Sequence, residues 1–130
     1  MEQGNKSIVV DAGNTRIKVG LFQETNLQEV HAFSNEELGK LKSYLIKHKN
    51  ISGIISSVRS DKNTKWIKGL LPHAILFNHA LPVTLTNNYE SPGTLGIDRL
   101  ANAIAAANIS DKNALIIDIG TCIKYDFVRY

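Results

Sequence analysis

The fold is decided by residues 7–18, which read SIVVDAGNTRIK. The apolar, β-branched run that ends at Asp11 predicts a short buried strand, and residues 12–14 form a turn. Residues 15–22 then alternate apolar and polar side chains with the period of two that is typical of a strand. The two segments predict a β-hairpin, with Asp11 at the end of its first strand and Lys18 on the polar face of its second.

The elements that follow predict an α/β fold. Residues 27–33 predict a third strand, and Ser34 with Glu37 forms a capping box that begins a helix running to about Lys47. Two more strands and two more helices are expected at residues 51–58 and 74–77 and at residues 61–71 and 97–108. Hairpins come first and crossovers later, so the βββαβαβα order predicts a mixed sheet. This is the order of a ribonuclease-H-like domain of the actin-like ATPase type.

The first hairpin has a second copy at residues 115–124, which read LIIDIGTCIK. Short β-hairpins can resemble one another by chance, but the Asp, Gly and Lys at matched places favour a duplication. A duplication predicts two lobes. Residues 1–110 would form the first lobe, and residues 111–130 would be the opening hairpin of a second, similar lobe. The chain is then expected to be the N-terminal half of a two-lobed protein.

Both hairpin turns carry groups that suit phosphate. In residues 11–15, DAGNT, the glycine permits close backbone approach, and the turn amides, Asn14 and Thr15 can donate to phosphoryl oxygens. Asp11 can hold Mg²⁺, and Lys18 can reach a phosphate as a point charge. An ordinary Asx-rich turn is the alternative for this segment alone. Residues 118–121, DIGT, repeat the pattern, and two such turns facing each other would clamp a polyphosphate.

Residues 96–99, GIDR, open the last predicted helix and suggest an acceptor site. Asp98 could take the proton of a substrate hydroxyl, and Arg99 could bind a carboxylate through two hydrogen bonds. A base that accepts a hydroxyl proton recurs in kinase sites. The alternative is purely structural, because the helix dipole favours an aspartate in the first turn.

Composition narrows the class of protein. The net charge is +3, but the lysines are scattered, so no nucleic-acid partner is expected. The single cysteine, Cys122, excludes an internal disulfide and is expected to be a small buried apolar residue rather than a nucleophile. The four histidines lack metal-ligand spacing. No run approaches a membrane span and the polar start is not a secretory signal, so a cytoplasmic location without a membrane partner is expected.

Three motifs together, at residues 11–18, 89–99 and 118–121, resemble the type III pantothenate kinase family in order and spacing. The resemblance implies that the γ-phosphoryl group of ATP is transferred to pantothenate, the first step of coenzyme A synthesis. It also implies ATP with Mg²⁺, an activating monovalent cation (K⁺ or NH₄⁺), and a homodimer with active sites near the subunit interface. Family members are about twice this length, so weak or absent kinase activity is expected of this chain alone.

The resemblance also implies roles for individual residues. Asp98 is the expected proton acceptor, Asp118 the expected ligand of the monovalent cation, and Thr121 an expected ATP contact. ATP and its phosphates are expected to contact Asp11, Ala12, Gly13, Asn14, Thr15, Arg16, Ile17, Lys18 and Thr121. Pantothenate is expected to contact Tyr89, Gly96, Ile97, Asp98 and Arg99.

Two other functions stay open from the sequence. One is another small-molecule kinase of the actin-like fold, such as a sugar or acetate kinase, which a panel of acceptors would distinguish. The other is a non-catalytic transcriptional regulator, although the sequence shows no helix-turn-helix with a basic recognition face.

Overall fold

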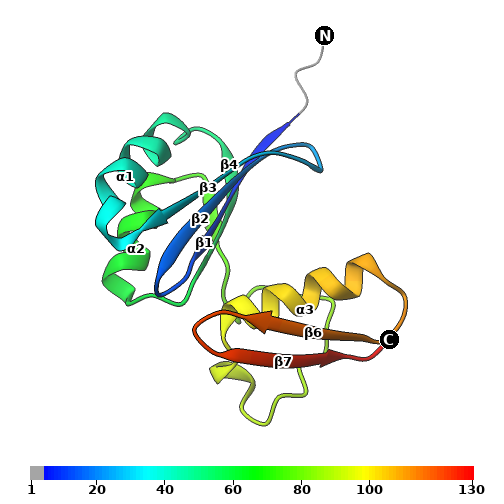
Figure 1. The fold of residues 1–130 in the computed structure, drawn as a ribbon. Helices are drawn as coiled ribbons and strands as arrows, with labels where there is room; N and C mark the ends of the chain where they lie inside the picture. The colour runs from blue at the N-terminus through cyan, green and yellow to red at the C-terminus, as the bar shows by residue number, and fades with distance from the viewer. Residues whose placement is uncertain (1–4) are drawn as a thin grey trace. The chain divides into compact units, whose positions relative to one another are not determined.

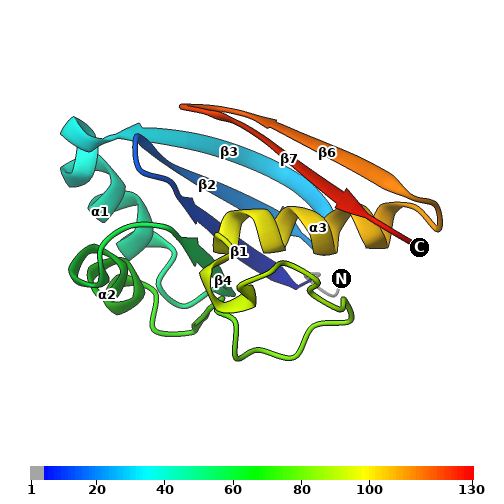
Figure 2. The same cartoon turned by 90° about the horizontal axis from the view of Figure 1, so that it is seen from below.

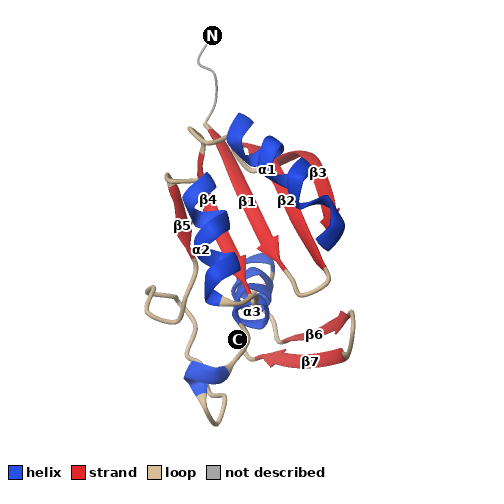
Figure 3. Ribbon diagram, turned by 90° about the vertical axis from the view of Figure 1, so that its left-hand side faces the viewer, coloured by secondary structure: helices blue, strands red, loops and turns tan. Residues whose placement is uncertain are grey.

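The first of two compact units is built on a five-stranded mixed sheet. A computed structural model describes residues 5–130, and these divide into two compact units, residues 5–77 and residues 78–130. In the first unit the strand order is β3-β2-β1-β4-β5; Figure 1 labels the first four strands of this order, and Figure 3 labels all five. The strands are β1 (Lys6–Ala12), β2 (Arg16–Gln23), β3 (Asn26–Ser34), β4 (Ser52–Ser57) and β5 (Ala74–Leu76). The first three pair antiparallel, β4 runs parallel to β1 and β5 parallel to β4, which confirms the predicted α/β, ribonuclease-H-like sheet.

Two helices cover the same face of this sheet (Figure 3). A 3₁₀ turn (Asn35–Glu37) leads into α1 (Leu38–Lys47), and α2 (Asp61–Leu70) follows β4. The expected capping box forms, since the Ser34 amide donates to Glu37 Oε2 at 3.1 Å. Ser60 takes the N-cap of α2, and Asp61 lies in the first turn of this helix.

Alternation along β1 and β2 fills the core of the first unit. Every second side chain turns towards the helices, where the core residues are almost fully removed from solvent. The largest of them are Ile8, Val10, Ile17, Val19, Leu41, Leu45, Ile55, Ile67 and Leu71. Burying each such side chain contributes about 1.5–3 kcal/mol. The polar members of the hairpin, including Asp11 and Lys18, therefore lie on the opposite face.

The second unit joins one helix to one hairpin. Helix α3 (Ile97–Ile109) packs against the antiparallel strands β6 (Ala114–Ile119) and β7 (Ile123–Val128) (Figure 2). A 3₁₀ turn (Pro92–Thr94) precedes the helix. This compact unit begins at Asn78, since α3 contacts both β6 and β7, and the expected lobe of residues 1–110 stays a prediction. That residues 111–130 open a second lobe stays a prediction.

The two hairpins share one pairing register. Asp11 lies opposite Lys18 in the first, and Asp118 lies opposite Lys124 in the second. Their surroundings differ, because the outer face of the second hairpin is apolar yet exposed. Its residues are Leu115, Ile117, Ile119, Ile123, Tyr125 and Phe127, which are 52–76% exposed. The expectation that Cys122 is buried was wrong, since this turn residue is also exposed.

No helix within residues 5–130 has the length and apolar character needed to cross a membrane.

Candidate functional site

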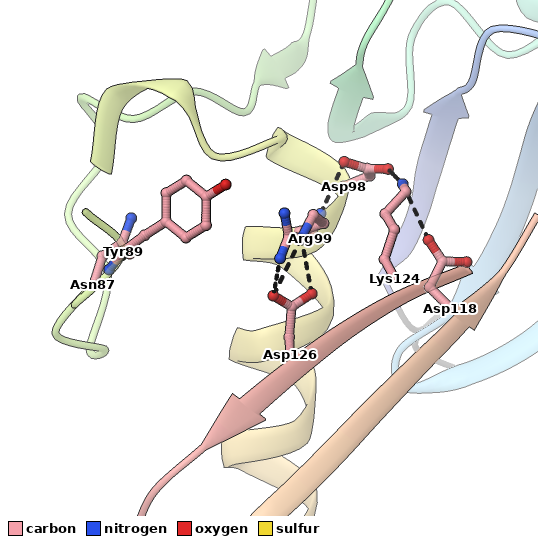
Figure 4. A network of polar contacts seen from close by, with 7 residues as sticks. All are labelled: Asn87, Tyr89, Asp98, Arg99, Asp118, Lys124 and Asp126. Carbon is pink, nitrogen blue, oxygen red and sulfur yellow. Dashed lines mark hydrogen bonds and ion pairs between the residues drawn. The ribbon is translucent and has the colours of Figure 1, made fainter. Parts of the chain in front are cut away.

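A lysine between two aspartates forms the centre of the candidate site in the second unit. Lys124 Nζ donates to Asp98 Oδ2 at 2.7 Å and lies 3.2 Å from Asp118 Oδ2 (Figure 4). All three side chains are partly buried, with 25–34% of each exposed. Asp98 comes from the first turn of α3, and the other two face each other across β6 and β7. The structure therefore brings together the predicted proton acceptor and the predicted cation ligand.

Gly96 gives the Asp98 carboxylate its place. A Cβ at this position would lie 2.5 Å from Asp98 Oδ1, so any larger residue would displace the carboxylate. Asp98 Oδ1 in turn accepts a hydrogen bond from the Arg99 amide at 2.9 Å. The glycine and the aspartate of the GIDR motif are thus linked by packing, which is a local reason for their spacing.

The environment of Asp98 keeps its carboxyl group ionised. Burial alone would raise its pKa, but the hydrogen bonds from Lys124 and from the Arg99 amide outweigh this effect and lower the pKa below its ordinary value. Asp98 is therefore a carboxylate at neutral pH that can accept a hydrogen bond from an alcohol. Phosphoryl transfer through a loose transition state requires little more of the base than correct position.

Arg99 belongs to a second cluster with Asp126 and Tyr89. Its Nη2 donates to Asp126 Oδ1 at 2.6 Å and its Nε to Asp126 Oδ2 at 3.0 Å, a bidentate pair that raises the pKa of Arg99. The guanidinium carbon lies 5.3 Å from the centre of the Tyr89 ring. Asn87 orients this loop, because its Oδ1 accepts a hydrogen bond from the Tyr89 amide at 3.0 Å. The cluster fixes a cation beside an aromatic ring.

A cleft of about 780 Å³ opens beside this second cluster. Its volume is in the range of small-molecule sites, about 300–1,000 Å³. It is lined by residues 84–89, by Leu95, Arg99, Leu100 and Ala103, and by residues 125–129. Two of the residues expected to bind pantothenate, Tyr89 and Arg99, therefore share one cleft. Asp98 is not part of its lining, since this carboxylate turns towards Lys124 (Figure 4).

In the first unit, Arg59 holds the turn between β1 and β2. Its Nε donates to the Gly13 carbonyl at 2.8 Å, and its Nη2 donates to the Asn14 carbonyl at 3.3 Å and to Asn35 Oδ1 at 2.5 Å. Asn35 Nδ2 also donates to the Asn14 carbonyl at 3.3 Å. Because Arg59 and Asn35 bind its carbonyls, the turn keeps a defined shape. A turn of fixed shape allows its backbone to approach a ligand closely.

Three residues with site contacts were not predicted from the sequence. Lys124 was noticed only as part of the repeat, and neither Arg59 nor Asp126 carried a motif signal. A signal existed for Asp126, because alternation along β7 puts it on the same face as Lys124. Arg59 gave none, because its turn contacts are 45 or more residues away in the chain. The predicted turns belong to different units, so their convergence on one nucleotide stays a prediction.

The residues fit a magnesium ion better than a monovalent cation. Mg²⁺ binds through one or two carboxylates, water and substrate phosphates, and the half-exposed Asp11, 3.9 Å from Lys18, can be such a ligand. Asp118 differs, because the Lys124 ammonium is already there. Lys18 is largely exposed and can move aside when an ion binds to Asp11, but Lys124 is held by two carboxylates and occupies the oxygens that a monovalent ion would need. K⁺ or NH₄⁺ does not fit beside Asp118 while Lys124 keeps this position.

Together the strand order and the helices define a domain of the ribonuclease-H-like class. It combines a hairpin with an Asp-Gly turn and a helix that opens with a carboxylate. Comparison with known families narrows this class. Residues 7–130 match the family model described as type III pantothenate kinase, and the chain belongs to that family.

Curated relatives support the same family. The chain is similar to proteins named "Type III pantothenate kinase" from Phocaeicola vulgatus (37% identical over 125 residues, 94% of this chain and 52% of the relative) and Bacteroides fragilis (38% over 126 residues, 94% and 51%). A third, from Flavobacterium johnsoniae, is 36% identical over 127 residues (93% and 51%). The chain thus spans about half the length of the curated relatives it matches. A Bacteroides thetaiotaomicron crystal structure described as having an actin-like ATPase fold and unknown function aligns with a TM-score of 0.43 at 15% identity, covering 58% of this chain and 33% of that one.

Proposed function

We propose that this protein takes part in the ATP-dependent phosphorylation of pantothenate, the first step of coenzyme A synthesis. The observation that carries the proposal is the position of Asp98, an ionised carboxylate at the start of α3, next in the chain to an arginine that lines a small-molecule cleft. Asp98 accepts the proton of the pantothenate hydroxyl as its oxygen attacks the γ-phosphorus of ATP. A new phosphorus–oxygen bond forms, the bond to the β-phosphate oxygen breaks, and ADP leaves.

The second cluster supplies the pantothenate site in this proposal. Arg99 binds the carboxylate of pantothenate, and Tyr89 packs against the remainder of the molecule. A guanidinium has five N–H donors, so Arg99 keeps donors for a ligand while Asp126 accepts from its Nε and Nη2. The bidentate pair prevents the side chain from rotating freely, so less conformational entropy is lost when the ligand binds.

The first turn supplies the nucleotide site. Asp11 holds Mg²⁺, which neutralises charge on the phosphates, and the amides of residues 12–15 donate to phosphoryl oxygens. Lys18 and the Thr121 hydroxyl contribute a charge and a further donor. The support for this assignment is the shape of the turn, since Arg59 and Asn35 bind the carbonyls of Gly13 and Asn14 and hold the turn in place.

The remaining expectations concern the whole protein. We propose a cytoplasmic homodimer in which residues 111–130 open a second lobe. The exposed apolar face of β6 and β7 supports the second lobe, because the matching residues of β1 and β2 are buried by α1 and α2. With half of the relatives' length present, the chain alone is expected to have weak or absent kinase activity.

The decisive experiment separates binding from turnover. Pantothenate binding to this chain is measured by ligand-observed NMR. Because the chain alone is expected to turn over weakly or not at all, ADP release is measured with a protein of the relatives' full length that includes it, under single-turnover conditions and against a panel of alcohol and carboxylate acceptors. Asp98→Asn is expected to bind pantothenate within about threefold of the wild type but to lower the transfer rate by about 10²–10⁴. Asp61→Asn is the matched control, because Asp61 also lies in the first turn of a helix. Transfer to another acceptor but not to pantothenate would refute the proposal.

A further inference from the structure

We propose that the Lys124 ammonium replaces the activating monovalent cation in this protein. It places one positive charge between Asp98 and Asp118, so that neither K⁺ nor NH₄⁺ is needed there. The role of Lys124 in catalysis rests on the proposed function, whereas its contacts with the two carboxylates are independent of that function.

The contacts of Lys124 are those of a bound ammonium ion. Its Nζ donates to Asp98 Oδ2 at 2.7 Å and lies 3.2 Å from Asp118 Oδ2, so two carboxylates from different elements share one cation. An alkylammonium carries the same charge as NH₄⁺ and donates hydrogen bonds in the same way. The Lys124 ammonium is covalently attached to β7, directly opposite Asp118 in the strand pairing. Its charge is therefore always present at the site, unlike that of an ion that must bind from solution.

The first hairpin shows that the strand pairing alone does not create this arrangement. Lys18 occupies the equivalent position opposite Asp11, but the two groups are 3.9 Å apart and their side chains are 62% and 49% exposed. Lys124 is only 29% exposed, because Asp98 at the start of α3 adds a second carboxylate. A long lysine side chain is ordinarily a solvated surface group, so the inward position of Lys124 indicates a specific role.

In this role Lys124 is a positioning residue. It contacts two carboxylates and acts on the reaction through them, by holding Asp98 Oδ2 in place beside the acceptor. A bound cation would compete for the same oxygens and would be repelled by the ammonium. The protein should therefore be indifferent to the identity of the monovalent cation, and loss of the Lys124 charge should create a requirement for one.

The test compares salts at equal ionic strength. Thermal unfolding of the full chain is followed in KCl, NH₄Cl and tetramethylammonium chloride for the wild type, Lys124→Met and Lys124→Arg. The wild type and Lys124→Arg are expected to have the same Tm in all three salts. Lys124→Met is expected to gain a saturable rise of about 4 °C that is specific to K⁺ or NH₄⁺. A K⁺-specific rise in the wild type, or none in Lys124→Met, would overturn the inference.

A second measurement needs no variant that must fold. In ¹⁵N-labelled wild type, a Lys side-chain ammonium held by two carboxylates exchanges its protons slowly enough to give its own NMR signal. That signal is expected to persist unchanged on titration with K⁺. Its loss or displacement by K⁺ would show that the ion takes the place of the lysine. Neither measurement uses pantothenate or ATP, so a failure here is distinct from a failure of the kinase proposal.

Discussion

The contact between Arg99 and Asp126 allows a quantitative test of the second unit. The pair joins the first turn of α3 to β7 through bidentate hydrogen bonds, the shortest of which is 2.6 Å, and the side chains are 22% and 18% exposed. Changing Asp126 to Asn keeps the shape of the side chain but removes its charge. It therefore asks how much the ion pair contributes to stability.

The magnitude follows from the geometry. Two unit charges about 4 Å apart attract each other by about 4 kcal/mol at an effective dielectric constant of ~20. Both groups lose hydration and rotamer freedom when they pair, which offsets about half of this attraction. We expect a coupling free energy of about 2 kcal/mol, well above the value of about 0–1 kcal/mol that is typical of surface pairs.

A double-mutant cycle measures this coupling. Urea unfolding of the wild type, Arg99→Gln, Asp126→Asn and the double variant gives the free energies of unfolding, and hydrogen exchange of α3 and β7 amides shows that the second unit is affected. The pair Lys40–Glu37, an exposed pair in the first unit, is the control and should show much weaker coupling. A coupling below about 0.5 kcal/mol for Arg99 and Asp126 would refute the reasoning.

Three further predictions concern packing and pH. Gly53→Ala should lower the free energy of unfolding by at least about 2 kcal/mol, because its Cβ would overlap the backbone of β1, whereas Gly39→Ala in α1 meets open space and should stabilise by about 0.5–1 kcal/mol. Burial lowers the pKa of His48, so the neutral imidazole contributes its full share to the free energy of unfolding above about pH 6.5, and that share is lost as the pH falls through the lowered pKa. The urea midpoint should therefore fall between pH 7 and pH 5, and His48→Gln should make this fall smaller. Val10→Thr should cost about 1–3 kcal/mol and Ile117→Thr less than about 0.5, by thermal unfolding, because the first is fully buried and the second is 52% exposed.

The sequence predicted pairing and capping well because these depend on neighbouring residues. Alternation identified the hairpin, and the Ser34–Glu37 capping box forms as its spacing indicated. The helix opened by GIDR begins at Ile97, as expected. In each case the controlling contacts lie within a few residues of one another, so a local pattern contains the necessary information.

The sequence could not predict contacts that depend on tertiary packing. Arg59 binds the Gly13 carbonyl from 46 residues away, and Lys124 binds Asp98 from 26 residues away. The exposure of Cys122 likewise depends on what covers the turn, and the burial preference of cysteine was a poor guide to it. Such residues have site contacts without a motif, so only the folded arrangement identifies them.

The same strand register has different consequences in the two units. Val10 and Val19 are fully buried beneath α1 and α2, whereas the outer face of β6 and β7 is exposed. On the opposite faces, Lys18 is a solvated charge, while Lys124 is held between two carboxylates. The hairpin sets which residues pair, but the helix packed on it decides whether its lysine is a surface group or part of a site. The burial and the ion pairs of Lys124 therefore depend on α3 as much as on the duplicated hairpin.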